Sequence, residues 1–277
     1  MFRKNNIQTI DFGALYRDQK QRSNSSVKTA KDWDKKAVNM ANNFGGIYPN
    51  SLINSIDFID AKTMLDLGSG AGTIAIAISD KFEKIYAVDF SQVTLDNLMR
   101  NCEAKNVKNI TPIKADIEGD FANVPYADIA IASRSLEVSD IEKTLVNINK
   151  RAKMRVYLTY KVGGSFLHAP ILQAIGRVVT PKPDYIYILN ILYNMGIYAE
   201  LKFIQSEGKG FHYQNETDYI KNVEQNIGEL SEIEKEKLAR YFDKVKDDKE
   251  ERDPPLTWAL ISYNTQTKER KWTRTMR

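Results

Sequence analysis

The sequence predicts an α/β protein built on a doubly wound, mostly parallel sheet of seven strands. Short apolar segments alternate with helical segments between residues 63 and 160, a pattern typical of parallel strands joined by right-handed crossovers. A glycine-rich turn directly follows the first of these apolar segments. The chain has 277 residues, of which 42% are hydrophobic and 27% charged, so it is long enough to bury one large core.

The alternation assigns most of the elements. Helices over 95–104 and 141–152 connect strands of the first group, and further helices are expected over 169–178 and 183–195. Two later apolar segments bring the number of strands to seven. The predicted strands are 63–67, 84–88, 110–114, 127–132, 155–160, 199–204 and 257–263.

Four regions follow from this assignment. Residues 1–60 precede the first strand and read as a helical lid, with one helix through Trp33 and another over 49–59. Ser231 and Glu234 form a capping box that opens a helix. This helix belongs to an insertion over residues 205–256. The insertion either packs outside the sheet or covers a substrate, and both alternatives stay open. The regions are 1–60, a core at 61–204, a helical insertion at 205–256, and a last strand with a basic tail at 257–277.

The glycine-rich turn predicts a nucleotide-like ligand. Glycines stand at 68, 70 and 72, and Asp66 lies two residues before the first. Glycine allows a tight turn and a close approach of backbone to ligand, and the next helix presents amide donors to an anionic group. The dinucleotide fingerprint is G-x-G-x-x-G, whereas Thr73 occupies the place of its last glycine here. Asp66 stands where a carboxylate can hold a cation such as an ammonium.

Polar residues follow the next three predicted strands. Asp89 ends the second strand about 20 residues beyond the glycines, where a carboxylate is expected to bind ribose hydroxyls. Asp116 and Ile117 follow the third strand, and Ser133 and Arg134 follow the fourth.

In order and spacing, these features resemble the class I, Rossmann-like methyltransferases that depend on S-adenosylmethionine (SAM), of the small-molecule type. The resemblance implies that the glycine loop lies against the methionyl group and that Asp116 and Ile117 contact adenine. It also implies that the last strand is antiparallel near one edge of the sheet. The cofactor residues so implied are Asp66, Gly68, Ser69, Gly70, Gly72, Asp89, Phe90, Asp116, Ile117 and Ser133.

The sequence offers several catalytic candidates but no single assignment. Because SAM supplies an activated methyl group, the protein must mainly align the acceptor and exclude water. Arg134 either holds a substrate carboxylate or phosphate or pairs with a neighbouring helix. His168 is either a proton acceptor or a structural histidine. The remaining candidates near strand ends are Tyr160, Glu137 and Lys161.

The N-terminal region contains Asp32-Trp33-Asp34-Lys35-Lys36-Ala37, which resembles the W-D-x-x-A pattern of small-molecule methyltransferases. Trp33, Tyr16 and Tyr48 are candidates to close over the site as a lid. The alternative for each aromatic ring is a place in the core.

Several classes of methyl acceptor are excluded because their sequence signatures are missing. Ser133-Arg134-Ser135-Leu136 lacks the prolines of the (N/D/S)-P-P-(Y/F/W) signature of base and glutamine methylation. A single cysteine, Cys102, and two histidines argue against a metal site. We therefore expect a small-molecule acceptor that takes the methyl group on oxygen, nitrogen or carbon. The alternatives are an RNA or protein methyltransferase, a SAM-binding module without turnover and, least favoured, a nicotinamide-dependent oxidoreductase.

We expect neither a nucleic-acid nor a membrane partner. The net charge is only +4, although residues 268–277 form a basic tail. No apolar run approaches the roughly 20 residues that span a bilayer, and the first residues do not read as a signal peptide. These features predict a cytoplasmic protein, and they carry no signal for its oligomeric state.

Overall fold

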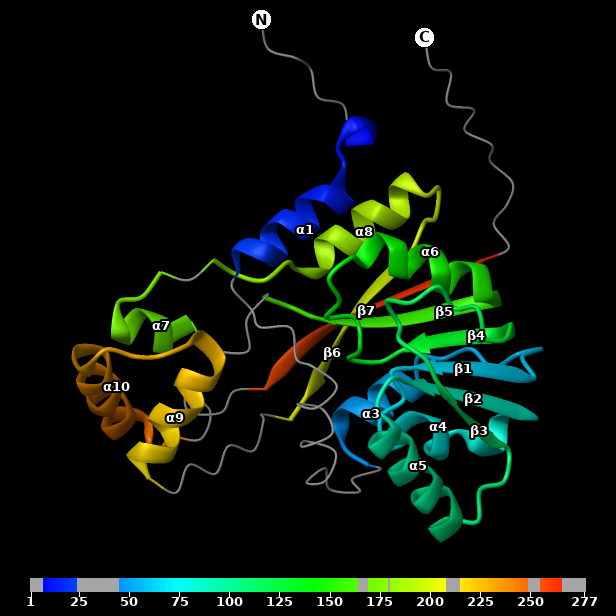
Figure 1. The fold of residues 1–277 in the computed structure, drawn as a ribbon, viewed down its shortest axis with the longest axis horizontal. Coiled ribbons are helices and arrows are strands. Elements are labelled where there is room, and N and C mark those ends of the chain that lie inside the picture. Colours follow the sequence, from blue (N-terminus) through cyan, green and yellow to red (C-terminus); the bar gives the residue numbers. More distant parts are fainter. Residues whose placement is uncertain are drawn as a thin grey trace, which may run out of the picture.

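A single seven-stranded sheet organises the chain (Figure 1). The computed structural model describes residues 7–23, 45–163, 169–178, 180–207, 215–248 and 255–265. The strand order across the sheet is β3-β2-β1-β4-β5-β7-β6. The strands are β1 (Thr63–Leu67), β2 (Lys84–Asp89), β3 (Ile110–Lys114), β4 (Ala127–Ala132), β5 (Ala152–Lys161), β6 (Glu200–Ser206) and β7 (Leu256–Asn264).

The sheet has the predicted α/β topology. Strands β1 to β5 pair in parallel, and β7 runs antiparallel to both β5 and β6. The antiparallel last strand near one edge is therefore confirmed. The strand order reverses between β1 and β4, and ligands of open α/β sheets bind beyond the carboxyl ends of the strands at such a switch point.

Helices cover both faces of the sheet (Figure 1). Apolar residues of α1, α6 and α8 pack on one face, and those of α3, α4 and α5 on the other. None of the described helices is both long and apolar enough to cross a bilayer. The helices are η1 (Ile7–Thr9), α1 (Phe12–Arg22), α3 (Ile47–Ile53), α4 (Thr73–Ala77), η2 (Ser79–Lys81), α5 (Gln92–Ala104), α6 (Ile141–Arg151), α7 (Ala169–Ile175), α8 (Tyr185–Asn194), α9 (Glu216–Ile227) and α10 (Glu232–Val245).

The helix expected over 49–59 was wrong in its second half. Helix α3 ends at Ile53, and the amide of Asp57 instead donates to the hydroxyl of Tyr157, at 2.8 Å. Ile56 is buried, but Ile59 is 69% exposed, so the regular spacing of isoleucines does not mark one helical face. The helix expected through Trp33 lies outside the described residues.

Two other helices are shorter than expected, and the local sequence explains both. Helix α7 ends at Ile175 because Gly176 takes a left-handed φ of 74° and its amide donates back to Leu172. Helix α8 begins at Tyr185 because the side chain of Asp184 accepts from the Tyr185 amide.

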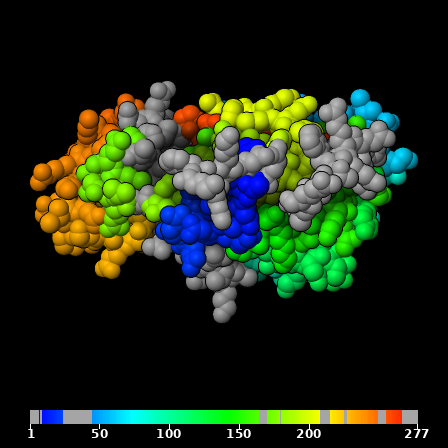
Figure 2. Space-filling model, turned by 90° about the horizontal axis from the view of Figure 1, so that it is seen from above, coloured from blue at the N-terminus to red at the C-terminus, as the bar shows by residue number. Residues whose placement is uncertain are grey.

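Helices α7, α9 and α10 form a unit beside the carboxyl ends of the strands (Figure 1), and their atoms gather at one end of the molecule in the space-filling view (Figure 2). Their buried apolar side chains make a cluster of their own, separate from the two clusters that cover the sheet. The predicted capping box of Ser231 and Glu234 is present at the start of α10. Arg177 joins the unit together, because its guanidinium donates two bonds of 2.6 Å to Glu234 and further bonds to the carbonyls of Ile227 and Glu229.

We expect Arg177→Lys to loosen this helical unit without unfolding the sheet. Lysine keeps the positive charge but cannot reproduce the forked pair of hydrogen bonds to Glu234. Amide hydrogen exchange should become several-fold faster in α9 and α10 and stay unchanged in β1 and β4. Arg240→Lys, at an exposed position of α10, serves as the control. Unchanged exchange in both variants would show that Arg177 does not hold the unit together.

Candidate functional site

The glycine loop connects β1 to α4 at the switch point of the sheet. Gly68, Gly70 and Gly72 have φ values of 72°, 56° and 92°. Residues other than glycine adopt this left-handed region only with strain. The amides of Gly68 and Ser69 both donate to the carbonyl of Val88, at 2.8 and 3.0 Å. The end of β2 therefore holds the loop in place.

The three glycines meet different surroundings. A Cβ at Gly68 would lie 2.3 Å from the Cβ of Ser135, and one at Gly72 would lie 2.3 Å from Cδ1 of Leu98. Both of these glycines are therefore required for packing within the protein. A Cβ at Gly70 would have no described atom within 4 Å. Gly70 thus marks the open side of the loop, where a ligand can come close to the backbone.

Two buried polar groups of this segment lack partners. Asp66 is 2% exposed and Ser69 is 7% exposed. The Asp66 Oδ2 atom and the Ser69 Oγ atom have no hydrogen-bond partner among the described residues. Burial raises the pKa of Asp66 to about 7, and the charge of Asp89 adds to this rise against a hydrogen bond from the Ala75 amide. Buried groups without partners are costly, so a ligand that pairs with them would gain affinity.

Asp89 links the loop to the end of β2. Its Oδ2 atom accepts from the amide of Gly70 and its Oδ1 atom from the amide of Ser91, both at 3.0 Å. An ionised carboxylate can accept about four hydrogen bonds, so a carboxylate at this position is able to bind the loop and sugar hydroxyls together. Phe90, which follows it, is half-buried.

The remaining predicted cofactor residues lie at the same edge of the sheet. The amide of Ala115 donates to the carbonyl of Asp89 at 3.1 Å, which carries the chain after β3 alongside the end of β2. Asp116 is exposed and Ile117 is half-buried there. Ser133, at the end of β4, lies 2.9 Å from the hydroxyl of Tyr48. The structure thus brings the ends of β1, β2, β3 and β4 together, as expected for parallel strands.

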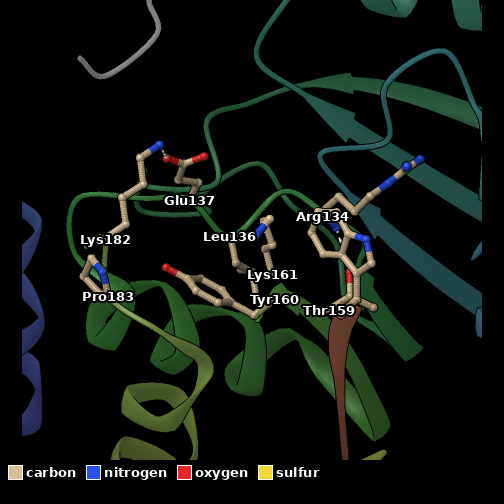
Figure 3. Close-up of a pocket in the computed structure, with 9 residues that line it drawn as sticks. Arg134, Leu136, Glu137, Thr159, Tyr160, Lys161, Lys182 and Pro183 are labelled. Carbon is tan, nitrogen blue, oxygen red and sulfur yellow. Dashed lines mark hydrogen bonds and ion pairs between the residues drawn. The ribbon is translucent and has the colours of Figure 1, made fainter. Parts of the chain in front are cut away.

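A pocket opens beside this loop, at the carboxyl ends of β4 and β5 (Figure 3). Its lining combines apolar and charged side chains. Its lining residues are Arg134, Leu136, Glu137, Thr159, Tyr160, Lys161, Lys182, Pro183 and Trp258.

Arg134 lies at the border between the pocket and the loop. Its φ is 56°, and its amide donates to Thr159 Oγ1 at 2.8 Å. The guanidinium carbon lies 4.3 Å from the centre of the Tyr48 ring, a cation–π contact. The described ion pairs do not include Arg134, so the structure gives no support to a pairing with a neighbouring helix.

Tyr48 connects α3 to the strand ends. Its hydroxyl lies 2.6 Å from Thr159 Oγ1, and its ring packs edge-on against Trp258 with a centroid distance of 5.5 Å. Tyr48 and Tyr16 are 1% and 0% exposed, so both rings belong to the core rather than to a movable lid. Thr159 and Trp258 were not predicted, because each lies inside a strand. The pairing of β5 with β7 places Trp258 opposite Lys161.

Tyr160 and Tyr16 form a buried hydroxyl pair. Their oxygens lie 3.4 Å apart, and the Tyr16 hydroxyl donates to the carbonyl of Val138 at 2.9 Å. Burial raises the pKa of both tyrosines. Tyr160 is therefore a neutral hydrogen-bonding group at neutral pH and not a tyrosinate base. His168 and Trp33 lie outside the described residues.

Glu137 joins two lysines at the rim of the pocket. Its Oε1 atom lies 3.5 Å from Lys20 Nζ and also pairs with Lys182 (Figure 3). Burial favours the neutral acid, but Lys182 and Lys20 outweigh this effect and hold the pKa of Glu137 below its usual value. Lys182 was missed from the sequence, because it lies in a proline-flanked segment without strand or motif character.

The comparisons with known proteins agree with this geometry. Residues 64–154 match the family model described as a methyltransferase domain. An uncharacterized protein of Haemophilus influenzae is 34% identical, over 93% of this chain and 98% of that protein.

Two solved structures share the fold. The YcgJ protein of Bacillus subtilis has a TM-score of 0.52 at 15% identity, covering 78% of this chain and 97% of that chain. Phosphoethanolamine N-methyltransferase 2 of Haemonchus contortus, solved with phosphomonomethylethanolamine and S-adenosylhomocysteine, has a TM-score of 0.51 at 16% identity. That match covers 90% of this chain and 59% of the Haemonchus chain.

The raised pKa of Asp66 predicts a pH dependence of stability in the ligand-free protein. The folded state keeps this proton up to about pH 7, whereas an unfolded chain loses it near 3.8. The folded state binds more protons between these values, so the free energy of unfolding falls as pH rises from about 4 to about 7, by at most about 1.4 kcal/mol per pH unit.

Urea unfolding at several pH values should show this fall in the wild type and a weaker one in Asp66→Asn. Asp80→Asn, at an exposed position, should retain the wild-type slope. If the stability difference between wild type and Asp66→Asn is the same at pH 5 and pH 8, Asp66 does not titrate as described.

Proposed function

We propose that this chain, which belongs to the class I, Rossmann-like family of SAM-dependent methyltransferases, transfers a methyl group from SAM to a small molecule. The observation that carries the proposal is the open side of Gly70 beside two buried atoms without described hydrogen-bond partners, Oδ2 of Asp66 and Oγ of Ser69. A loop at a topological switch point that is open at a glycine and lies beside polar atoms without partners is suited to a ligand with its own polar groups.

The residues present suit SAM. Asp66 would pair with the ammonium of the methionyl group, and that cation would favour the ionised carboxylate. Asp89 would accept from ribose hydroxyls while it holds the Gly70 amide. Asp116 and Ile117, after β3, would contact the adenine ring, one by hydrogen bonding and the other by packing.

Bound SAM would supply the methyl group on a positively charged sulfur, so the chain's own task is to place the acceptor. Leu136, Pro183 and Trp258 line the pocket next to the loop and would exclude water from it. The neutral hydroxyl of Tyr160 would hydrogen-bond the acceptor. Because alignment supplies much of the rate, no strong base is required of these residues.

Three features support a small-molecule acceptor over RNA or protein. The candidate pocket is recessed between strand ends and lined by both apolar and charged side chains. The unit of α7, α9 and α10 lies beside the carboxyl ends of the strands, in the position of a substrate cap (Figure 1). The segment after β4 also lacks the proline pair associated with methylation of bases and amides. We place this activity in the cytoplasm.

Gly70→Val should abolish cofactor binding and leave the fold intact. The valine side chain would occupy the open side of the loop, and the left-handed φ of 56° would add strain of roughly 1–2 kcal/mol. Calorimetry with S-adenosylhomocysteine measures the loss. Gly196→Val is the matched control, because Gly196 also has a left-handed φ of 77° and an open Cβ direction but lies after α8. Equal binding by both variants would remove the loop from the cofactor site.

Turnover tests the rest of the proposal. The purified protein is incubated with methyl-labelled SAM and, in separate reactions, a small-metabolite extract, total RNA and total protein. Label transferred to the small-molecule fraction is the expected result. Transfer to RNA or protein would support the alternative substrate classes. Tight binding of SAM without transfer to any fraction would support a binding module instead.

A further inference from the structure

The candidate acceptor pocket carries more positive than negative charge. Three of its lining residues are cationic, namely Arg134, Lys161 and Lys182, and one, Glu137, is anionic. Three further charged groups act on these residues. Lys20 pairs with Glu137, and Asp184 stabilises the charged form of Lys161. The charge of Arg134 in turn favours the ionised form of Glu207. Counting these three as well leaves an excess of one positive charge.

The two lysines are partly withdrawn from water. Lys161 is the last residue of β5 and is half-buried, with its amine donating to the carbonyl of Val162 at 3.0 Å. Burial lowers its pKa, and the charge of Lys182 lowers it further against the opposing effects of Asp184 and Glu137. A cation in a partly desolvated position gains more from an anionic ligand than one in bulk water.

The cations divide between two sides of the pocket. Figure 3 shows Lys182 and Glu137 together on one side, whereas the Arg134 side chain points away from them. Arg134 lies over Tyr48, whose hydroxyl also bonds Ser133 near the glycine loop. The sequence offered Arg134 as a candidate to hold a substrate carboxylate or phosphate, but the geometry favours the lysines for that role. Leu136 lies between the two sides in Figure 3 and contributes apolar surface.

We infer that the methyl acceptor is an anionic small molecule whose carboxylate or phosphate group is held by Lys161 and Lys182. The inference rests on the proposed function, because it identifies the substrate class of the same site. The apolar lining accommodates the body of the acceptor, and the lysines fix the end that does not react. Glu137 keeps Lys182 in position. Its carboxylate also repels a second anionic group, so ligands with two such groups bind less tightly.

A set of probes with one common ring tests the inference. Binding to the protein saturated with S-adenosylhomocysteine is measured by calorimetry for 4-hydroxybenzoate, 4-hydroxyphenyl phosphate, the neutral 4-hydroxybenzamide and the cationic tyramine. We expect the carboxylate or the phosphate to bind about tenfold or more tightly than the amide, and tyramine to bind weakest. The better of the two anions indicates which group the natural acceptor carries.

Lys161→Met and Lys182→Met should each reduce the preference for the anion over the amide, with little change in amide binding. Lys81→Met is the control, since Lys81 is exposed and lies in η2, before β2, outside the pocket lining. Equal affinity for amide and anions, or a preference that survives both lysine substitutions, would overturn the inference.

Cofactor binding separates this failure from failure of the proposed function. If S-adenosylhomocysteine binds and the probes show no charge preference, only the anionic acceptor is wrong. If the cofactor itself does not bind, the proposed function fails as well, and anion binding in the cofactor-free protein then decides whether the lysines form an anion site.

Discussion

The geometry of the candidate site depends on the hydrogen bonds that the end of β2 makes with the glycine loop. The Val88 carbonyl accepts from the amides of Gly68 and Ser69, and the Asp89 carboxylate accepts from the amide of Gly70. These bonds fix Gly68 and Gly70 in left-handed conformations, which only glycine adopts without strain. The loop is therefore organised before any ligand binds, so less conformational entropy is lost on binding.

This organisation has an energetic cost within the folded protein. Asp66 and Ser69 are buried in the loop region, and each has a polar atom that lacks a hydrogen-bond partner among the described residues. Burial also raises the pKa of Asp66 to about 7, so its carboxyl group keeps a proton at a pH where an exposed aspartate is ionised. Such groups lower stability unless a ligand completes their hydrogen bonding. The stability lost at the loop and the affinity offered to a ligand thus have one origin. The pocket beside it follows the same logic, with Lys161 partly desolvated at the end of β5.

The strands were predictable because parallel strands buried on both faces read as continuous apolar runs, and β1, β3 and β4 match their predicted bounds. The glycine loop was predictable because its spacing is local. What failed or was missed depends on contacts between distant residues. Helix α3 stops early where the backbone meets Tyr157, and Thr159 reaches Tyr48 from 111 positions away. Lys182 lies in the pocket beside Glu137, which is 45 positions away along the chain.

The position of β7 in the sheet determines the order in which the strands can pair during folding. It is the last described strand along the chain, yet it lies between β5 and β6 and pairs with both. During synthesis on the ribosome, β6 emerges about fifty residues earlier than its only described strand partner. Until β7 arrives, β5 has an open edge and the Lys161 side of the pocket lacks Trp258. All the residues that hold the glycine loop in place are therefore synthesised before the strand that completes the pocket, so the pocket is the last part of the candidate site to form.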